Sequence, residues 1–264
     1  MLKGAIHIHS NYSDGEFALG ALREIMISAG CDFVCMTDHA ESFDDKKLKA
    51  YTRECDLLSD DRFRFVAGLE YTCDRRMHVL GLGVTSLAAT TDPQEVIHHI
   101  EDQSGISVIA HPMDSMFEWI ETFDALPNGI ETWNSKYDGR YAPRPGTFRL
   151  LQRLQEREPR MRAFYGIDLH WRKQFRGLFN VLQASGSQRD EILSALSDGN
   201  YFATKDDLEL SSRGDLSESL IARFERVRAR SDRLRTLAKT AKKMTSRAGL
   251  TAPAPLKAYL RKLF

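Results

Sequence analysis

The chain has 264 residues, 42% of them hydrophobic and 28% charged, which is the composition of a soluble globular protein. This length can form one large α/β barrel or two modest domains. The sequence holds no run of about 18 apolar residues, so no membrane-spanning helix is expected. The first residues enter a strand pattern without a basic and apolar leader, so we expect no secretory signal and a cytoplasmic location.

The formal net charge of zero hides an uneven distribution of charged residues. Residues 221–264 hold thirteen Lys and Arg against two Asp and Glu, a balance of +11. Residues 1–220 therefore hold twenty-four against thirty-five, a balance of −11. An acidic body followed by a basic tail indicates a compositional boundary in the chain.

The cysteines form neither a C-x-x-C pair nor a zinc-knuckle spacing. We therefore expect reduced thiols in a cytoplasmic protein. The four residues are Cys31, Cys35, Cys55 and Cys73.

Strand and helix patterns alternate along the first 205 residues. Apolar runs predict strands at residues 3–10, 32–39, 64–72, 78–84, 107–111, 129–134, 163–170, 177–184 and 201–204. Helical spacing predicts helices at residues 17–29, 44–58, 93–103, 148–157 and 190–198. This alternation is typical of an α/β fold with a mostly parallel sheet.

Histidines and carboxylates stand at the carboxyl ends of five predicted strands. Two residues apart on one strand, His7 and His9 share a face. The other strand ends carry Asp38, His39, Glu70, His111, Asp168 and His170. Such side chains are poor core fillers, and this edge of a β/α barrel is where active sites are built. The pattern therefore predicts a metal site.

These residues, taken in order, resemble the motifs of the PHP (polymerase and histidinol phosphatase) superfamily of metal-dependent phosphoesterases. The motifs are His7-x-His9-Ser10, Ser13-Asp14-Gly15, Thr37-Asp38-His39, Glu70, His78, Ala110-His111-Pro112 and Asp168-x-His170. The resemblance covers about residues 3–205 and implies a distorted (β/α)7 TIM-like barrel. We expect residues 1–208 to form this barrel and residues 209–264 to form a basic helical extension.

The resemblance also implies two or three divalent metal ions. The first metal would be held by two histidines and two carboxylates, His7, His9, Glu70 and Asp168. Glu70 would bridge to a second metal, which His78 and His111 also hold. The third metal would be held by Asp14, His39 and His170. Imidazole and carboxylate ligands suit Zn, Mn or Fe.

Alternatives remain open for single residues. Asp14 stands where some relatives have histidine, and it lies in a capping-box pattern, so it can instead cap the following helix. His78 follows two arginines, as a surface histidine would. Asp38 is expected beside a ligand rather than on a metal.

The expected activity is hydrolysis of a phosphate ester, a monoester by preference, through attack of a metal-bound hydroxide. Asp168 lies in the predicted catalytic centre, and His39 or His170 would protonate the leaving oxygen. For the small phosphorylated substrate, the loop after residue 134 offers Lys136, Arg140 and Arg144, with Arg144 as first choice. The alternative for these three is a solvated loop.

Two other functions compete with this one. A nuclease or phosphodiesterase would use the same metals on a diester, and a metal-stabilised binding module would bind metal without turnover. The apolar positions of the basic tail predict a helix from residue 220 that ends at Gly249 and Pro253, although their helical spacing is broken at Ser231. A second short amphipathic piece is predicted at residues 256–264. Its expected role is packing on the acidic barrel, or docking to an anionic membrane or a protein partner. Nucleic acid is a weaker candidate because the tail has few aromatics.

Overall fold

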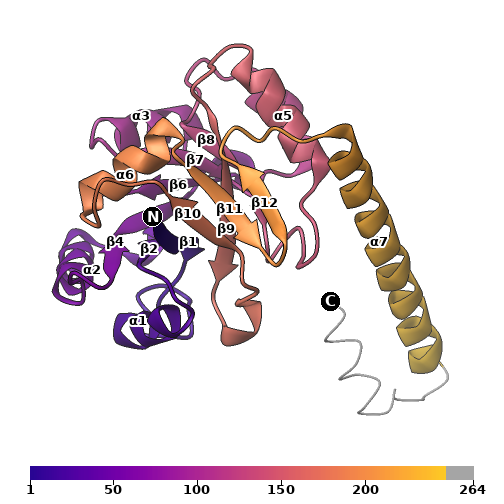
Figure 1. The fold of residues 1–264 in the computed structure, drawn as a ribbon, viewed down its shortest axis with the longest axis horizontal. Coiled ribbons are helices and arrows are strands. Elements are labelled where there is room, and N and C mark those ends of the chain that lie inside the picture. Colours follow the sequence, from indigo (N-terminus) through magenta and orange to yellow (C-terminus); the bar gives the residue numbers. More distant parts are fainter. Residues whose placement is uncertain (248–264) are drawn as a thin grey trace.

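The structure, a computed structural model, describes residues 1–247, with side chains placed through residue 240 except at positions 235, 238 and 239. A mixed sheet forms the body, and helices lie around it (Figure 1). The strands are β1 Leu2–Ile8, β2 Phe33–Met36, β3 Asp38–His39, β4 Arg64–Val66, β5 Gly68–Thr72, β6 His78–Leu82, β7 Ile106–Ala110, β8 Gly129–Asn134, β9 Arg162–Leu169, β10 Phe179–Leu182, β11 Tyr201–Lys205 and β12 Leu208–Ser211.

Helices connect most of the strands, as the sequence predicts. The α-helices are α1 Leu19–Ser28, α2 Asp45–Leu57, α3 Pro93–Glu101, α4 Phe117–Ile120, α5 Pro145–Gln155, α6 Arg189–Asp198 and α7 Glu218–Arg247. Single turns of 3₁₀-helix occur at Ala40–Ser42, Asp74–Arg76, Asp114–Met116 and Arg172–Gln174. Among the described residues, no helix is both long and apolar enough to span a membrane.

Local sequence signals explain the ends of several helices. The Asp44 side chain caps α2 by accepting from the Lys47 backbone N–H at 2.7 Å. Asp92 caps α3 in the same way, with Pro93 as the first helical residue. Helix α6 ends at Gly199, whose left-handed φ of 76° suits glycine.

Strand β1 stands at the junction of three runs of strands. On one side it pairs with parallel β2, which pairs with parallel β4. On the other side it pairs with parallel β9, and the ladder continues through β8, β7, β6 and β5 to β3. A third run, antiparallel β10, β11 and β12, begins at the first residues of β1.

The mixed α/β fold is confirmed, but the expected TIM-like (β/α)7 barrel is not, because the sheet is not closed. Thr37 separates β2 from β3, and Ala67 separates β4 from β5, so the ladder is interrupted where the two runs approach each other. Strand β6 also runs antiparallel to β5 and β7. The connection of residues 73–77 is too short for the crossover that a parallel strand needs.

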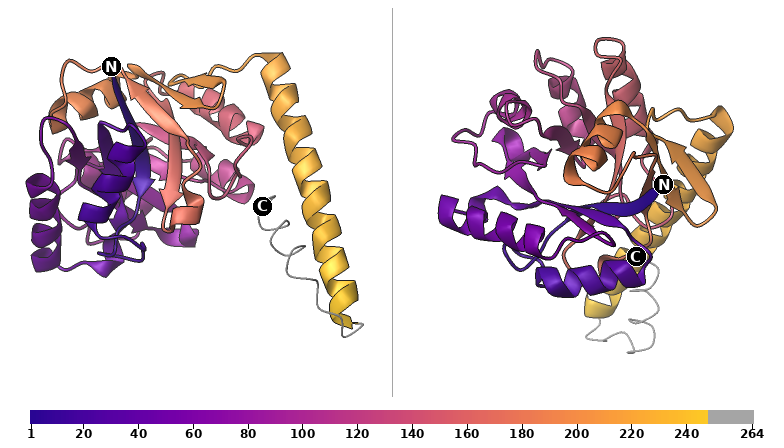
Figure 2. Two further views of the ribbon diagram at one scale, coloured as in Figure 1. Left: turned by 60° about the horizontal axis from the view of Figure 1, so that its bottom comes forward. Right: turned by 60° about the vertical axis from the view of Figure 1, so that its left-hand side comes forward.

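The tail forms the helix that the sequence predicts from residue 220. Helix α7 continues through Ser231, where the spacing of the apolar positions is broken (Figure 2). Serine lowers helix propensity by only a fraction of the cost of glycine or proline, which explains the continuity. Strand β12, which the sequence did not predict, spans the expected boundary at residue 208, and the two-domain division stays a prediction. Residues 256–264 lie outside the described part.

Buried apolar side chains of the strands and of the helices that pack on them form one hydrophobic core. All four cysteines are buried free thiols, which fits the expectation of reduced cysteines. Strands β8 and β9 approach so closely that a Cβ on Gly129 would lie 2.2 Å from the Arg162 carbonyl oxygen. A glycine is therefore required there by the packing of backbone against backbone.

We expect Gly129→Ala to lower the free energy of unfolding by about 2–3 kcal/mol, because the β8 and β9 backbones must move apart. Gly20→Ala is the matched control, since no atom lies within 4 Å of its added Cβ and it stands in helix α1. The control should be neutral or stabilising by about 0.5 kcal/mol. Urea denaturation of both variants measures the difference, and equal midpoints would contradict it.

Candidate metal centre

The nine predicted metal ligands meet at one edge of the sheet. Most of them end parallel strands or follow their carboxyl ends, which lie side by side. His78 is the first residue of β6, and it reaches the same edge because β6 runs antiparallel. Asp14 comes from the loop after β1 and is half exposed. Antiparallel pairing therefore completes a ligand set that parallel strands alone would not supply.

A single buried carboxylate, that of Glu70, lies at the middle of the centre. Its Oε2 is 3.3–3.4 Å from three imidazole nitrogens, those of His7, His9 and His39. Its Oε1 is 2.6 Å from His78 Nδ1 and 3.3 Å from His111 Nε2. Because both oxygens face imidazoles, Glu70 has the geometry of a bridging ligand.

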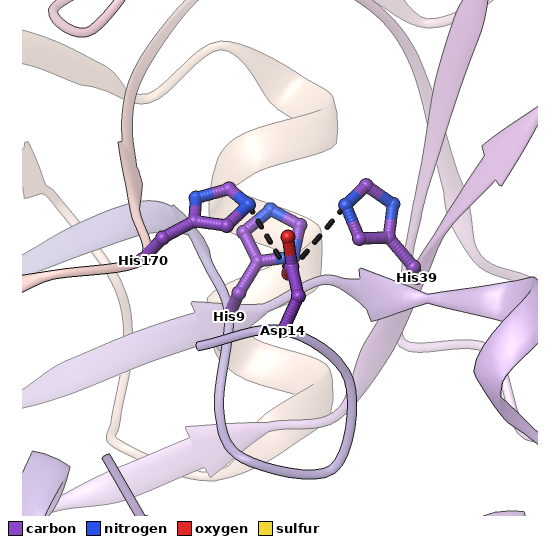
Figure 3. A group of neighbouring side chains, drawn as sticks. All are labelled: His9, Asp14, His39 and His170. Atoms are coloured by element: carbon purple, nitrogen blue, oxygen red, sulfur yellow. Dashed lines mark ion pairs between the residues drawn. The ribbon is translucent and has the colours of Figure 1, made fainter. Parts of the chain in front are cut away.

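Three groups of side chains have ligand atoms close enough to share an ion, each within 4.8 Å of the others. Figure 3 shows the first, in which Asp14 faces His39 and His170 beside His9. The other groups are His7 with His9 and Asp168, and His7 with Glu70 and His111. The groups overlap in His7 and His9, and His9 also lies near Asp14, where the prediction did not place it. The division of the candidate ligands between two or three metals stays a prediction. His78 contacts Glu70 but belongs to none of the three groups.

Four buried imidazole nitrogens lack a hydrogen-bond partner among the described residues. They are His7 Nε2, His9 Nδ1, His9 Nε2 and His39 Nδ1. Buried polar atoms are nearly always satisfied, so a cluster of four orphaned nitrogens beside carboxylates needs an explanation. A divalent metal provides one, since the neutral imidazole nitrogen is a metal ligand. The residues present therefore fit divalent metal ions.

The sequence analysis missed Glu131, a buried carboxylate on β8. It accepts a hydrogen bond from His7 Nδ1 at 2.8 Å, which turns His7 Nε2 toward the centre. It also accepts from the His111 backbone N–H and from Asn134 Nδ2, both at 2.9 Å. The one feature of the sequence that could have indicated Glu131 is a single carboxylate inside an otherwise uncharged strand, Gly129–Asn134. The Glu131 carboxylate fits only because residue 166 is a glycine. A Cβ at Gly166 would lie 1.7 Å from Glu131 Oε1.

Asp38 belongs to none of the groups of candidate ligands. Its two oxygens accept from the backbone N–H and the hydroxyl of Ser10 and of Ser13, at 2.6–3.1 Å. Burial raises the pKa of Asp38, and these four hydrogen bonds act to lower it. Asp38 thus fixes the loop that carries Asp14, rather than contacting a ligand side chain directly.

The backbone is strained at three ligands. His7, His111 and Asp168 have φ angles of 67°, 30° and 50°, which non-glycine residues rarely adopt. Both ladders of β1 shift register between Ile6 and Ile8, at the position of His7. The predicted arrangement of His7 and His9 on one strand face therefore becomes a bulged strand end that still brings both rings to Glu70.

Charges in the centre oppose the effect of burial on several groups. Burial acts to lower the pKa of His7, but Glu131, Asp168 and Glu70 together raise it well above its usual value. Burial lowers the pKa of His9 well below its usual value. Burial acts to raise the pKa of Glu70 and of Asp168, but His7 and its neighbours hold both carboxyls well below their usual range.

The three predicted substrate-binding residues lie in different places. Lys136 points into the centre, with Nζ 2.8 Å from Asp168 Oδ1 and 3.3 Å from His170 Nδ1. The Arg144 guanidinium instead bonds Asp138, Asp114 and the Pro112 carbonyl, which ties the rim loops together. Arg140 is exposed and stacks over Tyr141. Their roles toward a substrate stay predictions, with Lys136 the best placed.

We expect Glu131→Gln to weaken divalent-metal binding by about 10- to 100-fold, because partners of metal-ligating histidines have effects of this size. The replacement removes the negative charge and places an amide where the His111 N–H and Asn134 Nδ2 now donate. Glu24→Gln, an exposed change on α1, is the matched control. Calorimetric titration with Zn²⁺ or Mn²⁺ measures the affinity, and equal values for both variants would contradict this role.

Metal binding should weaken as the pH falls. The raised pKa of His7 means that a bound metal must displace a proton over a wide pH range. Below that pKa, we expect the affinity to fall by about tenfold per pH unit for each displaced proton. Titration in two buffers with different ionisation enthalpies counts the protons released, and a pH-independent affinity between pH 6 and 8 would overturn this view.

Comparison with known proteins shows what the chain is similar to. No protein-family model matches it. The DNA polymerase/3′-5′ exonuclease PolX of Bacillus subtilis is 32% identical over 77 residues, which cover 26% of this chain. The match spans only 14% of the length of PolX.

Solved structures match over most of the chain. A two-domain protein from Bacteroides vulgatus, described as containing a predicted PHP-like metal-dependent phosphoesterase, has a TM-score of 0.56 at 15% identity. The match covers 85% of this chain and 69% of that one. PsfC from Pseudomonas syringae has a TM-score of 0.53 at 14% identity, over 86% of this chain and 98% of PsfC. The chain therefore shares its fold with a protein described as containing a predicted PHP-like metal-dependent phosphoesterase, in agreement with the resemblance of its motifs.

Proposed function

We propose that this protein is a metal-dependent hydrolase of phosphate esters, with a small phosphorylated monoester as its substrate. The observation that supports this most directly is the Glu70 carboxylate among five imidazoles, four of whose nitrogens are orphaned and buried. The fold shared with PHP-like phosphoesterases agrees with it. Two or three divalent ions, Zn, Mn or Fe, would be held by the three groups of ligands.

When bound, such ions lower the pKa of water toward about 7 and polarise the phosphate ester. The residues of the chain supply the rest. Glu131 keeps the His7 ring in place, and Asp38 keeps the loop of Asp14 in place. Lys136 would bind a phosphate oxygen, because its positively charged ammonium group reaches the centre and would attract the negatively charged phosphate.

Protonation of the leaving oxygen requires an imidazole that is not bound to metal. Of the two candidates, His39 is better placed, since its side chain is 20% exposed against 4% for His170. His39 also faces Asp14 at 3.6 Å, which can hold the ring in position. We therefore assign this step to His39 when the Asp14 group holds no metal.

The second candidate function is cleavage of a phosphodiester, as in a nuclease. The relative that favours it is named a 3′-5′ exonuclease, although the match covers a small part of that protein. The same candidate ligands fit a monoester or a diester, because the metals would activate water and polarise the phosphoryl group in either substrate. The third candidate is a non-catalytic binding module that metal stabilises. Nothing supports it, because none of the nine candidate ligands is replaced by an apolar residue.

Phosphate release from a panel of monoesters, diesters and short oligonucleotides, with Mn²⁺ or Zn²⁺ added, tests the proposal. We expect turnover of monoesters, and a fall in kcat on the order of a thousandfold in Asp168→Asn, which loses a ligand. Asp190→Asn, an exposed change on α6, should keep full activity. Turnover of diesters alone would establish the nuclease, and tight metal binding without any turnover would establish the binding module.

A further inference from the structure

Helix α7 leaves the body at the rim of the metal centre. Its first turns are anchored by buried Phe224 and by the ion pair between Glu225 and Arg149 of α5. One turn later, Arg228 donates to the carbonyl oxygen of Asp138, in the loop that follows β8. Asp138 in turn binds Asn134, whose side chain reaches Asp168. The helix thus passes the active-site rim at Arg228.

The remaining part of α7 projects beyond this rim. Residues 229–247 continue as helix for about 28 Å at 1.5 Å per residue. Figures 1 and 2 show α7 running beside the body, with its C-terminal end reaching past it. Leu234 and Leu237, one turn apart, are exposed on this part, together with Arg230 and Arg233. We call residues 229–240 the distal helix. It combines exposed leucines with basic side chains.

The exposed apolar side chains gather on the same side of the protein. Eight large ones are exposed among the described residues. Two, Met1 and Leu57, lie at the opposite end of the strands, because Met1 precedes β1 and Leu57 ends α2. The other six follow the carboxyl ends of strands or lie on the distal helix, and they are Met113, Tyr137, Tyr141, Trp171, Leu234 and Leu237.

Each exposed rim aromatic is accompanied by a cation. Lys136 lies over Tyr137 at 5.1 Å, Arg140 over Tyr141 at 5.7 Å and Lys173 over Trp171 at 5.4 Å. Exposed carboxylates on this side include Asp114, which is paired with Arg144, Asp14 of the candidate metal centre, and Asp232 of the distal helix. Aromatic rings with cations, beside a basic helix with exposed leucines, are the composition of a surface that meets anionic lipid headgroups.

We propose that the active-site face of this protein docks on an anionic phospholipid bilayer. The docking surface consists of the rim pairs Tyr141 with Arg140 and Trp171 with Lys173, and of the distal helix. A nucleic acid would use the cations and rings but would leave Leu234 and Leu237 in water. The bilayer takes up all of them. Docking then holds the mouth of the metal centre against the headgroup layer.

Flotation of the full chain with phosphatidylcholine vesicles, with and without phosphatidylglycerol, tests the proposal. We expect binding to the anionic vesicles and little binding to the neutral ones. Replacing both leucines (L234S/L237S) should lower the partition coefficient at least tenfold, and R230Q/R233Q should lower it on the order of tenfold. Leu57→Ser, an exposed leucine at the opposite end, should bind as the parent does. Circular dichroism verifies that the variants keep their helices.

Tryptophan fluorescence reports on the rim independently. Of the three tryptophans, Trp171 is the exposed one, so its emission should shift to the blue when anionic vesicles are added. The shift should be lost in Trp171→Phe. This signal places the metal-centre rim, and not only the helix, at the lipid surface.

Several results would overturn the proposal: equal binding to neutral and anionic vesicles, equal binding of L234S/L237S and the parent, or no binding. Tighter binding to an oligonucleotide than to vesicles would make nucleic acid the partner. Self-association that L234S/L237S abolishes would make a second copy the partner. None of these measurements involves hydrolysis. A failure of membrane docking can therefore be distinguished from a failure of the proposed function.

Discussion

The candidate site depends on one carboxylate that is buried among imidazoles. Glu70 would be costly to bury alone, and its negative charge is compatible with the interior only because five histidines from four segments surround it. In return, the carboxylate holds together side chains that come from β1, β3, β6 and the end of β7. A second buried carboxylate, that of Glu131, bonds the other nitrogen of His7. The His7 ring therefore lies between two carboxylates.

The positions of the candidate ligands could be predicted because the ends of strands can be recognised in a sequence. His7, Glu70 and Asp168 each end an apolar run, and parallel strands bring their ends to one edge. Glu131 was missed because its importance comes from contacts with His7 and His111, which are distant in the sequence. The interruptions at Thr37 and Ala67 were equally invisible, since both residues stand within apolar runs that read as continuous strands.

The centre and its rim are built on different principles. The ligands stand on the strands and on short loops fixed by buried hydrogen bonds, such as those of Asp38 with Ser10 and Ser13. The rim consists of the loops after β7, β8 and β9. Arg144 ties the first two loops together, and Arg228 of α7 bonds the second. Chemistry therefore rests on the rigid part, while the surface that meets a substrate or a membrane rests on the part that tolerates change.

The left-handed backbone at His7, His111 and Asp168 has a consequence for the stability of this protein. Each of these residues holds a conformation that costs about 1–3 kcal/mol and that glycine would adopt freely. Glycine would relieve this strain, but at His7 it would also leave the buried carboxylates of Glu70 and Glu131 without their imidazole partner. At these three positions the strain is therefore the cost of placing an imidazole or a carboxylate at the candidate centre.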